Sequence, residues 1–222
     1  MRHIGLTGGI GSGKSTIAGV LEHMGYPVFY SDQEAKKLYV THPLLKNELI
    51  AILGKESYQN GIFQKHVLAT QLFENLALQE KIAALVHPLV RERFNEWAEQ
   101  QTTDLVFNEA AILFETAAYQ QFDATILVIA PLETRIQRVQ SRDNLSREEI
   151  LSRVANQWPD AKKMGLTPYI IQNDGQPLLQ QIEEVLLQLK SVWKVKGLVH
   201  HFDMDSAVLT KFEATFFKTR DA

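Results

Sequence analysis

A glycine-rich segment near the amino end constrains this chain more than any other feature. Residues 8–15 read Gly-Gly-Ile-Gly-Ser-Gly-Lys-Ser and match the pattern G-x-x-x-x-G-K-[ST] in full. In such a loop the backbone N–H groups curl around a phosphate, and glycine is needed because a side chain would block that approach. A short β-type run, residues 3–7, precedes the loop, and residues 15–24 carry apolar side chains at helical spacing. The segment therefore predicts a strand, a phosphate-binding loop and a helix.

Two residues of this loop have separate predicted roles. The helix that begins near Lys14 directs its first N–H groups, and the positive end of its dipole, toward the same anion. Lys14 is expected to reach the β- and γ-phosphates, and the Ser15 hydroxyl to ligate Mg²⁺. A dinucleotide-binding loop is excluded, because its spacing from Gly9 requires glycine or alanine where Lys14 stands. The predicted ligand is a nucleoside triphosphate.

The rest of the chain alternates between strand and helix patterns, which indicates an α/β fold with a parallel sheet. Near-continuous apolar runs are typical of parallel strands covered on both faces. The predicted strands are residues 3–7, 27–30, 104–108, 124–130 and 169–171. Between residues 33 and 102 the pattern is helical, with expected interruptions at Pro43, Asn60-Gly61 and His87-Pro88. Capping boxes are predicted for Ser31 with Glu34 and for Ser146 with Glu149.

Composition limits the class of protein. The 222 residues suit one domain, or one domain with an insertion. A net charge of −3 argues against a chain that coats nucleic acid, and the absence of cysteine excludes disulfides and thiolate ligands. No apolar run approaches the roughly 18 residues of a membrane span, so we expect a cytoplasmic protein without a membrane partner.

Several nucleotide-binding classes lack their signatures here. No Asn-Lys-x-Asp or Leu-Ser-Gly-Gly-Gln segment occurs, which argues against guanine-nucleotide switches and transport ATPases. The run 124–130 ends without an acidic residue, so Glu109 is the nearest substitute, either as a magnesium ligand or as a plain strand-end carboxylate. A kinase remains. Arg135, Arg138 and Arg142 share one predicted helical face, which could close over a γ-phosphate or be a solvated basic surface.

The opening segment, residues 4–16, closely resembles that of the dephospho-CoA kinase family, and further matches follow in order as far as about residue 190. These matches are Ser31-Asp32 with Ala35, Asn60-Gly61 with Leu68 and Phe73, His87-Pro88 as a helix start, Ile112 to Glu115, Arg138 with Arg142-Asp143, Gln157, and Asn173-Asp174-Gly175. The chain departs from the family pattern at Ala111, at Thr167-Pro168 and at Lys65. The departures weaken residue assignments in the acceptor half.

The resemblance implies a three-layer P-loop NTPase fold with a helical acceptor-binding insertion and a small lid. Its activity would be ATP- and Mg²⁺-dependent phosphorylation of the ribose 3′-hydroxyl of dephospho-CoA, the last step of CoA biosynthesis. The expected kinase domain is residues 1–195, followed by an extension, 196–222, of unknown role. Within that domain we expect a nucleotide core at 1–32 and 103–195, an insertion at 33–102 and a lid at 139–157.

The resemblance also implies roles for individual residues. Asp32 would orient the acceptor hydroxyl and take its proton, or would only interact with a helix dipole; Arg142 would be the catalytic contact from the lid. Asn173 would lie beside the adenine, or form an ordinary turn. Acceptor contacts are expected at Lys65, His87 and Arg91. The predicted ATP-binding set is Gly8, Gly9, Gly11, Ser12, Gly13, Lys14, Ser15, Thr16, Arg138 and Asn173.

Two rival functions stay open at the level of sequence. One is another P-loop small-molecule or nucleoside monophosphate kinase, which would differ in the insertion. The other is a non-catalytic nucleotide-binding regulator, against which Asp32 and the arginine series argue. We expect a monomer or small homo-oligomer, with residues 198–199 and 212–217 belonging to an amphipathic helix in the extension.

Overall fold

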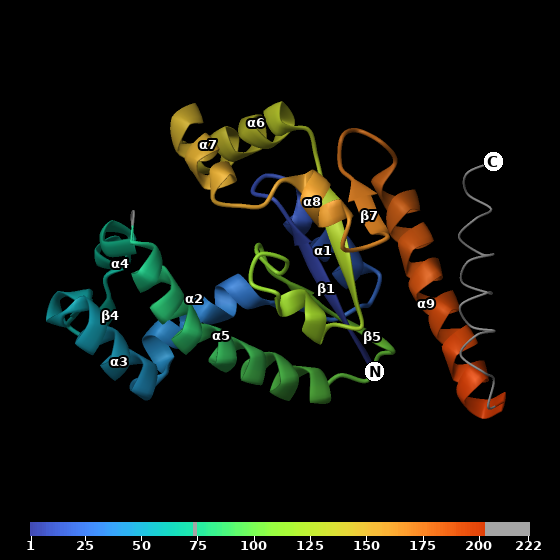
Figure 1. The fold of residues 1–222 in the computed structure, drawn as a ribbon, viewed down its shortest axis with the longest axis horizontal. Helices are drawn as coiled ribbons and strands as arrows, with labels where there is room; N and C mark the ends of the chain where they lie inside the picture. The colour runs from blue at the N-terminus through green and yellow to red at the C-terminus, as the bar shows by residue number, and fades with distance from the viewer. Residues whose placement is uncertain (73–74, 203–222) are drawn as a thin grey trace. The chain divides into compact units, whose positions relative to one another are not determined.

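The computed structural model describes residues 1–72 and 75–202. Its central feature is a five-stranded, fully parallel sheet in the order β2-β5-β1-β6-β7 (Figure 1). The strands are β1 (Arg2–Gly8), β2 (Val28–Tyr30), β5 (Leu105–Glu109), β6 (Ala124–Ile129) and β7 (Tyr169–Gln172). All five lie where the sequence predicted them, within one residue at each end. Because β1 is central, the loop that follows it opens at the middle of the carboxyl edge of the sheet.

The chain separates into two compact units, residues 1–178 and 179–222. The first unit holds the sheet, the helices α1–α8, a small antiparallel hairpin and two 3₁₀ turns. Their bounds are α1 (Lys14–His23), α2 (Ser31–Thr41), α3 (Pro43–Leu53), η1 (Lys55–Ser57), β3 (Tyr58–Gln59), β4 (Ile62–Phe63), α4 (Lys65–Leu72), α5 (Leu76–Glu99), η2 (Ala118–Gln121), α6 (Leu132–Asp143), α7 (Arg147–Ala155) and α8 (Asp160–Met164).

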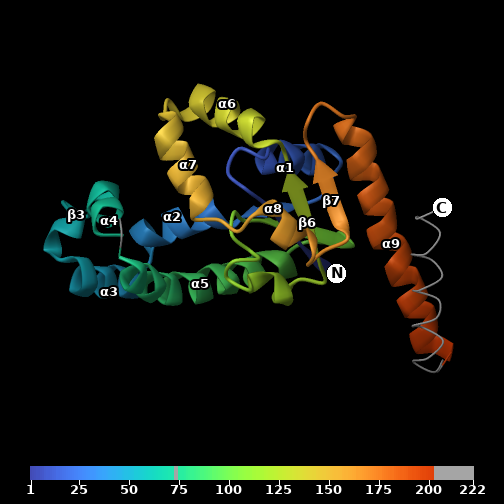
Figure 2. The ribbon, with the colours of Figure 1, turned by 45° about the horizontal axis from the view of Figure 1, so that its top comes forward.

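The helical insertion has a hydrophobic core of its own. Elements α2 to α5 and the β3–β4 hairpin gather to one side of the sheet in both ribbon views (Figures 1 and 2). Their buried side chains are Leu38, Leu45, Leu49, Leu53, Tyr58, Phe63, Ile82 and Val86. The Asn60-Gly61 turn was predicted and is present with positive φ at both residues. The two short strands that it joins were not predicted.

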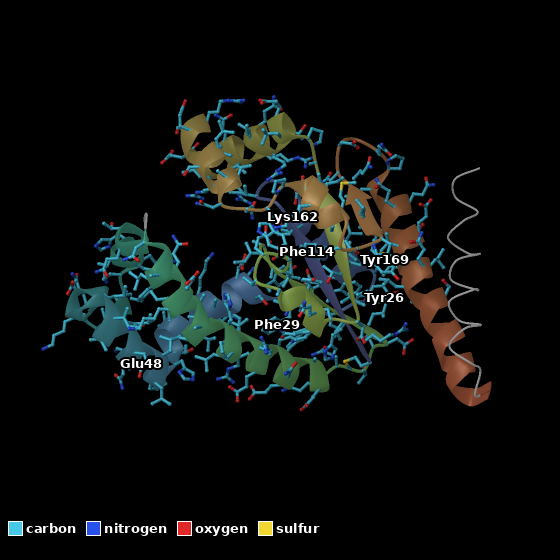
Figure 3. The ribbon with its side chains drawn as sticks, viewed as in Figure 1. Tyr26, Phe29, Glu48, Phe114, Lys162 and Tyr169 are labelled. Carbon is cyan, nitrogen blue, oxygen red and sulfur yellow. The ribbon has the colours of Figure 1, made fainter. Side chains whose placement is uncertain are left out.

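Helix α5 connects this second core to the sheet. Its carboxyl half buries Phe94 and Ala98 against Phe29 of β2 and Val106 of β5, where Phe29 is labelled in Figure 3. The prediction that His87-Pro88 interrupts or starts a helix is wrong, since α5 runs through Pro88 without a break. An internal proline costs roughly 3 kcal/mol, but buried contacts on both sides of it hold the helix.

Helix α1 begins at Lys14 as expected, but it buries a slightly different face. Ile17, Ala18 and Leu21 are buried, whereas Met24 is exposed. The capping box predicted for Ser31 is also wrong. The residue before α2 is Tyr30, without a side-chain cap, and the Ser31 hydroxyl donates to Asn108 Oδ1 instead. A tertiary partner on the adjacent strand thus replaces the local one.

Helices α6 and α7 form a small helical pair over the carboxyl edge of the sheet. The predicted capping box of Ser146 and Glu149 is present at the start of α7. Three buried residues, Ile136, Val139 and Ile150, join the two helices, and we call them the lid cluster.

The second unit begins within α9 (Leu178–Phe202). Ile182, Val185, Leu186 and Leu189 are buried along it. The expected helix at 212–217 lies outside the described residues. Among the helices that the structure describes, none has the length and apolar character needed to cross a bilayer.

Candidate active site

The phosphate loop occupies residues 8–13, between the end of β1 and the start of α1. Gly11 and Gly13 adopt φ values of +77° and +95°, which favour glycine. A Cβ atom at Gly9 would overlap the Arg135 guanidinium, and one at Gly13 would overlap the Asn173 amide. The glycines are therefore required on the outer side of the loop as well, because side chains pack directly against its backbone.

Lys14 lies among acidic groups at the end of the loop. Its Nζ is 3.9 Å from Glu109 Oε1, and both side chains are nearly buried. Burial lowers the pKa of Lys14, while the charges of Glu109 and Asp32 act in the opposite direction. Burial also raises the pKa of Glu109, against the lowering effect of Lys14. Lys14 is thus a buried ammonium near two carboxylates. Burial removes the water that would stabilise its positive charge, and an anionic ligand such as phosphate can stabilise that charge instead.

Two of the three arginines in the series contact the loop from behind. Arg135 is 6% exposed and its Nε donates to Ile10 O at 2.9 Å. Arg138 donates to the carbonyls of Gly11 and Ser12 at 3.5 and 3.4 Å, and to Asn173 O at 3.1 Å. These bonds use the carbonyl side of the loop, which leaves the N–H side for an anion.

Asn173 follows β7 and is part of the same assembly. Its Nδ2 donates to Ser12 O at 2.9 Å, and its Oδ1 accepts from Arg138. Arg142 is different. Its guanidinium makes two 2.8 Å hydrogen bonds to the neighbouring Asp143 and is well exposed. The structure thus brings Arg138 and Asn173 to the loop but not Arg142.

A cavity of about 540 Å³ lies between the helices α2 and α5 of the insertion and the segment 108–122 that follows from the end of β5. Three predicted site residues line it together: Asp32 at the start of α2, and His87 and Arg91 on α5. Most of the remaining wall is apolar, including Val86, Val90, Phe94, Ile112, Leu113 and Phe122. Lys65 does not line this cavity; it is exposed at the first residue of α4.

Asp32 is positioned by the residue before it. Ser31 Oγ donates to Asn108 Oδ1 at 2.6 Å, which ties the first turn of α2 to the end of β5. Asn108 is 4% exposed and lines the same cavity. Sequence reasoning missed Asn108, although a polar Asn-Glu pair that ends a strongly apolar strand was a signal for it.

Among the cavity residues, His87 has a pKa below its ordinary value. Partial burial lowers the pKa of His87, and the positive charge of Arg91 one turn later lowers it further. The ring is therefore neutral near pH 7 and can accept or donate one hydrogen bond.

The donor set near the loop fits Mg²⁺. The Ser15 hydroxyl is exposed at the first turn of α1, and the Glu109 carboxylate lies 3.9 Å from Lys14 in the same region. Hard oxygen donors are what Mg²⁺ prefers. No cluster of three or more histidine, aspartate or glutamate ligands occurs among the described residues.

Comparison with known proteins gives one consistent family. The family described as dephospho-CoA kinase matches residues 2–178. A dephospho-CoA kinase from Bacteroides fragilis is 40% identical over 185 residues, which is 82% of this chain and 90% of the relative. One from Thermus thermophilus is 37% identical over 183 residues, 82% of this chain and 87% of the relative.

Solved structures agree with this relationship. A crystal structure of a Thermus thermophilus protein, 35% identical, matches with a TM-score of 0.75 and covers 86% of this chain and 96% of its own. A dephospho-CoA kinase from Campylobacter jejuni, 21% identical, matches with a TM-score of 0.59 over 87% of this chain and 98% of its own. The second likeness supports the P-loop α/β fold.

Proposed function

The chain belongs to the dephospho-CoA kinase family, and we propose that it transfers the γ-phosphoryl group of ATP to the ribose 3′-hydroxyl of dephospho-CoA. It is an ATP-dependent kinase that acts in CoA biosynthesis. The observation that supports the finer proposal is the position of Asp32. This carboxylate lines the cavity and also interacts electrostatically with Lys14 of the phosphate loop. One carboxylate therefore stands between the two sites that phosphoryl transfer must bring together.

The proposed roles on the nucleotide side follow from the loop. Backbone N–H groups between residues 11 and 16 bind the phosphates, and Lys14 neutralises charge that develops on the transferred group. Arg138 and Asn173 hold the loop from its carbonyl side, through hydrogen bonds to Ser12 O. When the lid closes, Arg142 would have to break its hydrogen bonds to Asp143 and bind phosphate instead.

A magnesium ion would be held by the Ser15 hydroxyl, with the Glu109 carboxylate available directly or through water. When bound, such an ion neutralises charge on the phosphates during transfer. The high burial of Glu109 and its contact with Lys14 also allow a purely electrostatic role for this carboxylate.

On the acceptor side, Asp32 takes the proton of the attacking hydroxyl. A carboxylate is a weak base, and this suits a loose transition state in which the nucleophile needs orientation more than activation. Arg91 and His87 are proposed to bind the phosphates of dephospho-CoA, and the apolar wall to pack against its pantetheine arm. Lys65 remains a prediction only.

The proposal includes the division of the chain. Residues 1–32 and 103–195 would form the nucleotide core, 33–102 the acceptor insertion, and 139–157 the lid within residues 1–195. The separate hydrophobic core of the insertion and the buried cluster that joins α6 to α7 support this division. The monomeric or small homo-oligomeric state stays a prediction.

One assay tests the proposed acceptor and position. ADP release is measured with ATP–Mg²⁺ and, in separate reactions, dephospho-CoA, nucleoside monophosphates or no acceptor. We expect turnover only with dephospho-CoA, and a product that loses its new phosphate to a 3′-nucleotidase. Turnover only with a nucleoside monophosphate would refute the acceptor. A product resistant to the 3′-nucleotidase would refute the position.

A further inference from the structure

Ile10, the third residue of the phosphate loop, contacts the lid through three different groups. Its N–H donates to Gln157 Oε1 at 2.8 Å, two residues beyond the end of α7. Its carbonyl accepts from Arg135 Nε at 2.9 Å, on α6. Its side chain packs against the lid cluster. The general motif allows any residue at this position, but here the N–H, the carbonyl and the side chain of Ile10 all make contacts.

These contacts come from both sides of the α6–α7 connection. Arg135 lies before the α6–α7 connection and Gln157 lies after it. Arg135 also forms an ion pair with Asp160 at 3.3 Å, so the two sides are joined to each other. The loop has little freedom to absorb a movement, because Arg135 packs directly against Gly9 and Gly11 as well. A change in the lid must therefore be transmitted to the Ile10 peptide, or be resisted by it.

The chain that leaves the lid also contacts a loop that lines the acceptor cavity. We call residues 157–163 the return segment; Lys162, labelled in Figure 3, belongs to it. The N–H of Trp158 donates to Glu115 Oε1 at 3.0 Å. The fully buried Lys163 places its Nζ 2.7 Å from the same oxygen. Removing one partner of such a pair would leave a buried charge without compensation, so separating the two segments is costly.

Glu115 stands in the loop 110–117, which forms one wall of the cavity. Ile112, Leu113 and Thr116 from this loop line the cavity directly. The return segment therefore joins two places with different tasks. Gln157 holds the phosphate loop, and Trp158 and Lys163 hold the wall of the acceptor cavity through Glu115.

We propose that Gln157 is a positioning residue that couples nucleotide binding to acceptor binding. Phosphates that fill the loop fix the Ile10 peptide, Gln157 carries this order into the return segment, and the Glu115 loop then holds the cavity in its binding shape. Neither Gln157 nor Lys163 lines the cavity, so their effect is on the link between the sites. This inference rests on the proposed function for the identity of the acceptor.

The test measures dephospho-CoA affinity by calorimetry, with and without Mg²⁺ and an ATP analogue that has a methylene bridge between its β- and γ-phosphates. In the wild-type protein the analogue should tighten binding at least about fivefold. In Gln157→Met, which keeps the side-chain length and removes the acceptor oxygen, the gain should fall below about twofold. The matched control is Gln137→Met, an exposed residue on α6, which should keep the full gain.

A second variant covers the case in which Gln157→Met does not fold. The pair Glu115→Gln with Lys163→Met removes both buried charges together and keeps a side-chain acceptor for Trp158. It should also reduce the gain to below about twofold. A purely structural role would lower the melting temperature of these variants and leave the gain unchanged.

The outcomes separate the two proposals. If the ATP analogue leaves the affinity of the wild-type protein for dephospho-CoA unchanged, this inference is overturned. It is also overturned if a variant that folds keeps the full gain in affinity. Failure of the wild-type protein to bind dephospho-CoA at all would overturn the proposed function, and this inference with it.

Discussion

The phosphate loop and the acceptor cavity are built in opposite ways. The loop is a continuous run of residues whose working groups are backbone N–H donors, and side chains serve it from outside. The cavity is assembled from side chains on α2, on α5 and on the segment 108–122, which are far apart in sequence. The loop therefore depends on local backbone geometry, and the cavity depends on the packing of the insertion against the sheet.

This difference predicts how each site responds to change. A substitution in the loop should affect every reaction that uses ATP, because the loop is common to all acceptors. A substitution in the cavity should change the binding of the acceptor and leave nucleotide binding intact. Asp32 belongs to both regions and should separate binding from turnover.

The largest effect is expected for Lys14→Met. Loss of the ammonium removes charge stabilisation from the transferred phosphoryl group, so kcat/KM for ATP should fall about a thousandfold. The control is Lys36→Met, an exposed residue on α2. Steady-state ADP release measures both variants. Kinetics of Lys14→Met close to wild type would contradict the loop assignment.

Asp32→Asn should separate the two regions. Its kcat should fall at least about a hundredfold, because the amide cannot take the hydroxyl proton. Its affinity for the ATP analogue, measured by calorimetry, should stay within about twofold of wild type. Asp174→Asn, on an exposed turn, is the matched control. A near-normal rate in Asp32→Asn would remove the proposed role.

The same contrast explains what could be predicted from sequence. Five strands, the start of α1 and the Ser146 cap were predicted because each depends on neighbouring residues. The Ser31 cap and the break at Pro88 were predicted wrongly, since a partner on β5 and buried contacts along α5 outweighed local preference. At the site, Lys14 was evident from its motif. Asn108 was not, because its role depends on a contact 77 positions away in the sequence.

Arg91→Met tests the cavity alone. The KM for dephospho-CoA should rise roughly tenfold, as expected for loss of one charge-assisted hydrogen bond to phosphate, and the KM for ATP should not change. Arg93→Met is the matched control, since Arg93 lies on the same helix, pairs with Glu96 and does not line the cavity. Equal changes in both KM values would show that the two regions are not separable.

The smallest effect is a pH dependence of stability that arises in the cavity. Burial and Arg91 hold the pKa of His87 below its ordinary value of 6.5. Between that lowered value and 6.5 the unfolded chain binds more protons at this position than the folded chain does. The free energy of unfolding should therefore fall as the pH is lowered through 6.5, and His87 should contribute no such slope above about pH 7.5.

Urea unfolding of the wild type and His87→Gln at pH 8, 6 and 5 measures how much His87 contributes to the pH dependence of the free energy of unfolding. The variant should lose less stability between pH 8 and pH 5 than the wild type, and His66→Gln, at an exposed position on α4, should not. Arg91→Met should reduce the slope only in part, because burial is the larger cause and remains in that variant. A slope in His87→Gln equal to that of the wild type would show that the cavity does not hold this ring in its neutral form, and the acceptor side would then lack the neutral hydrogen-bonding group proposed for it.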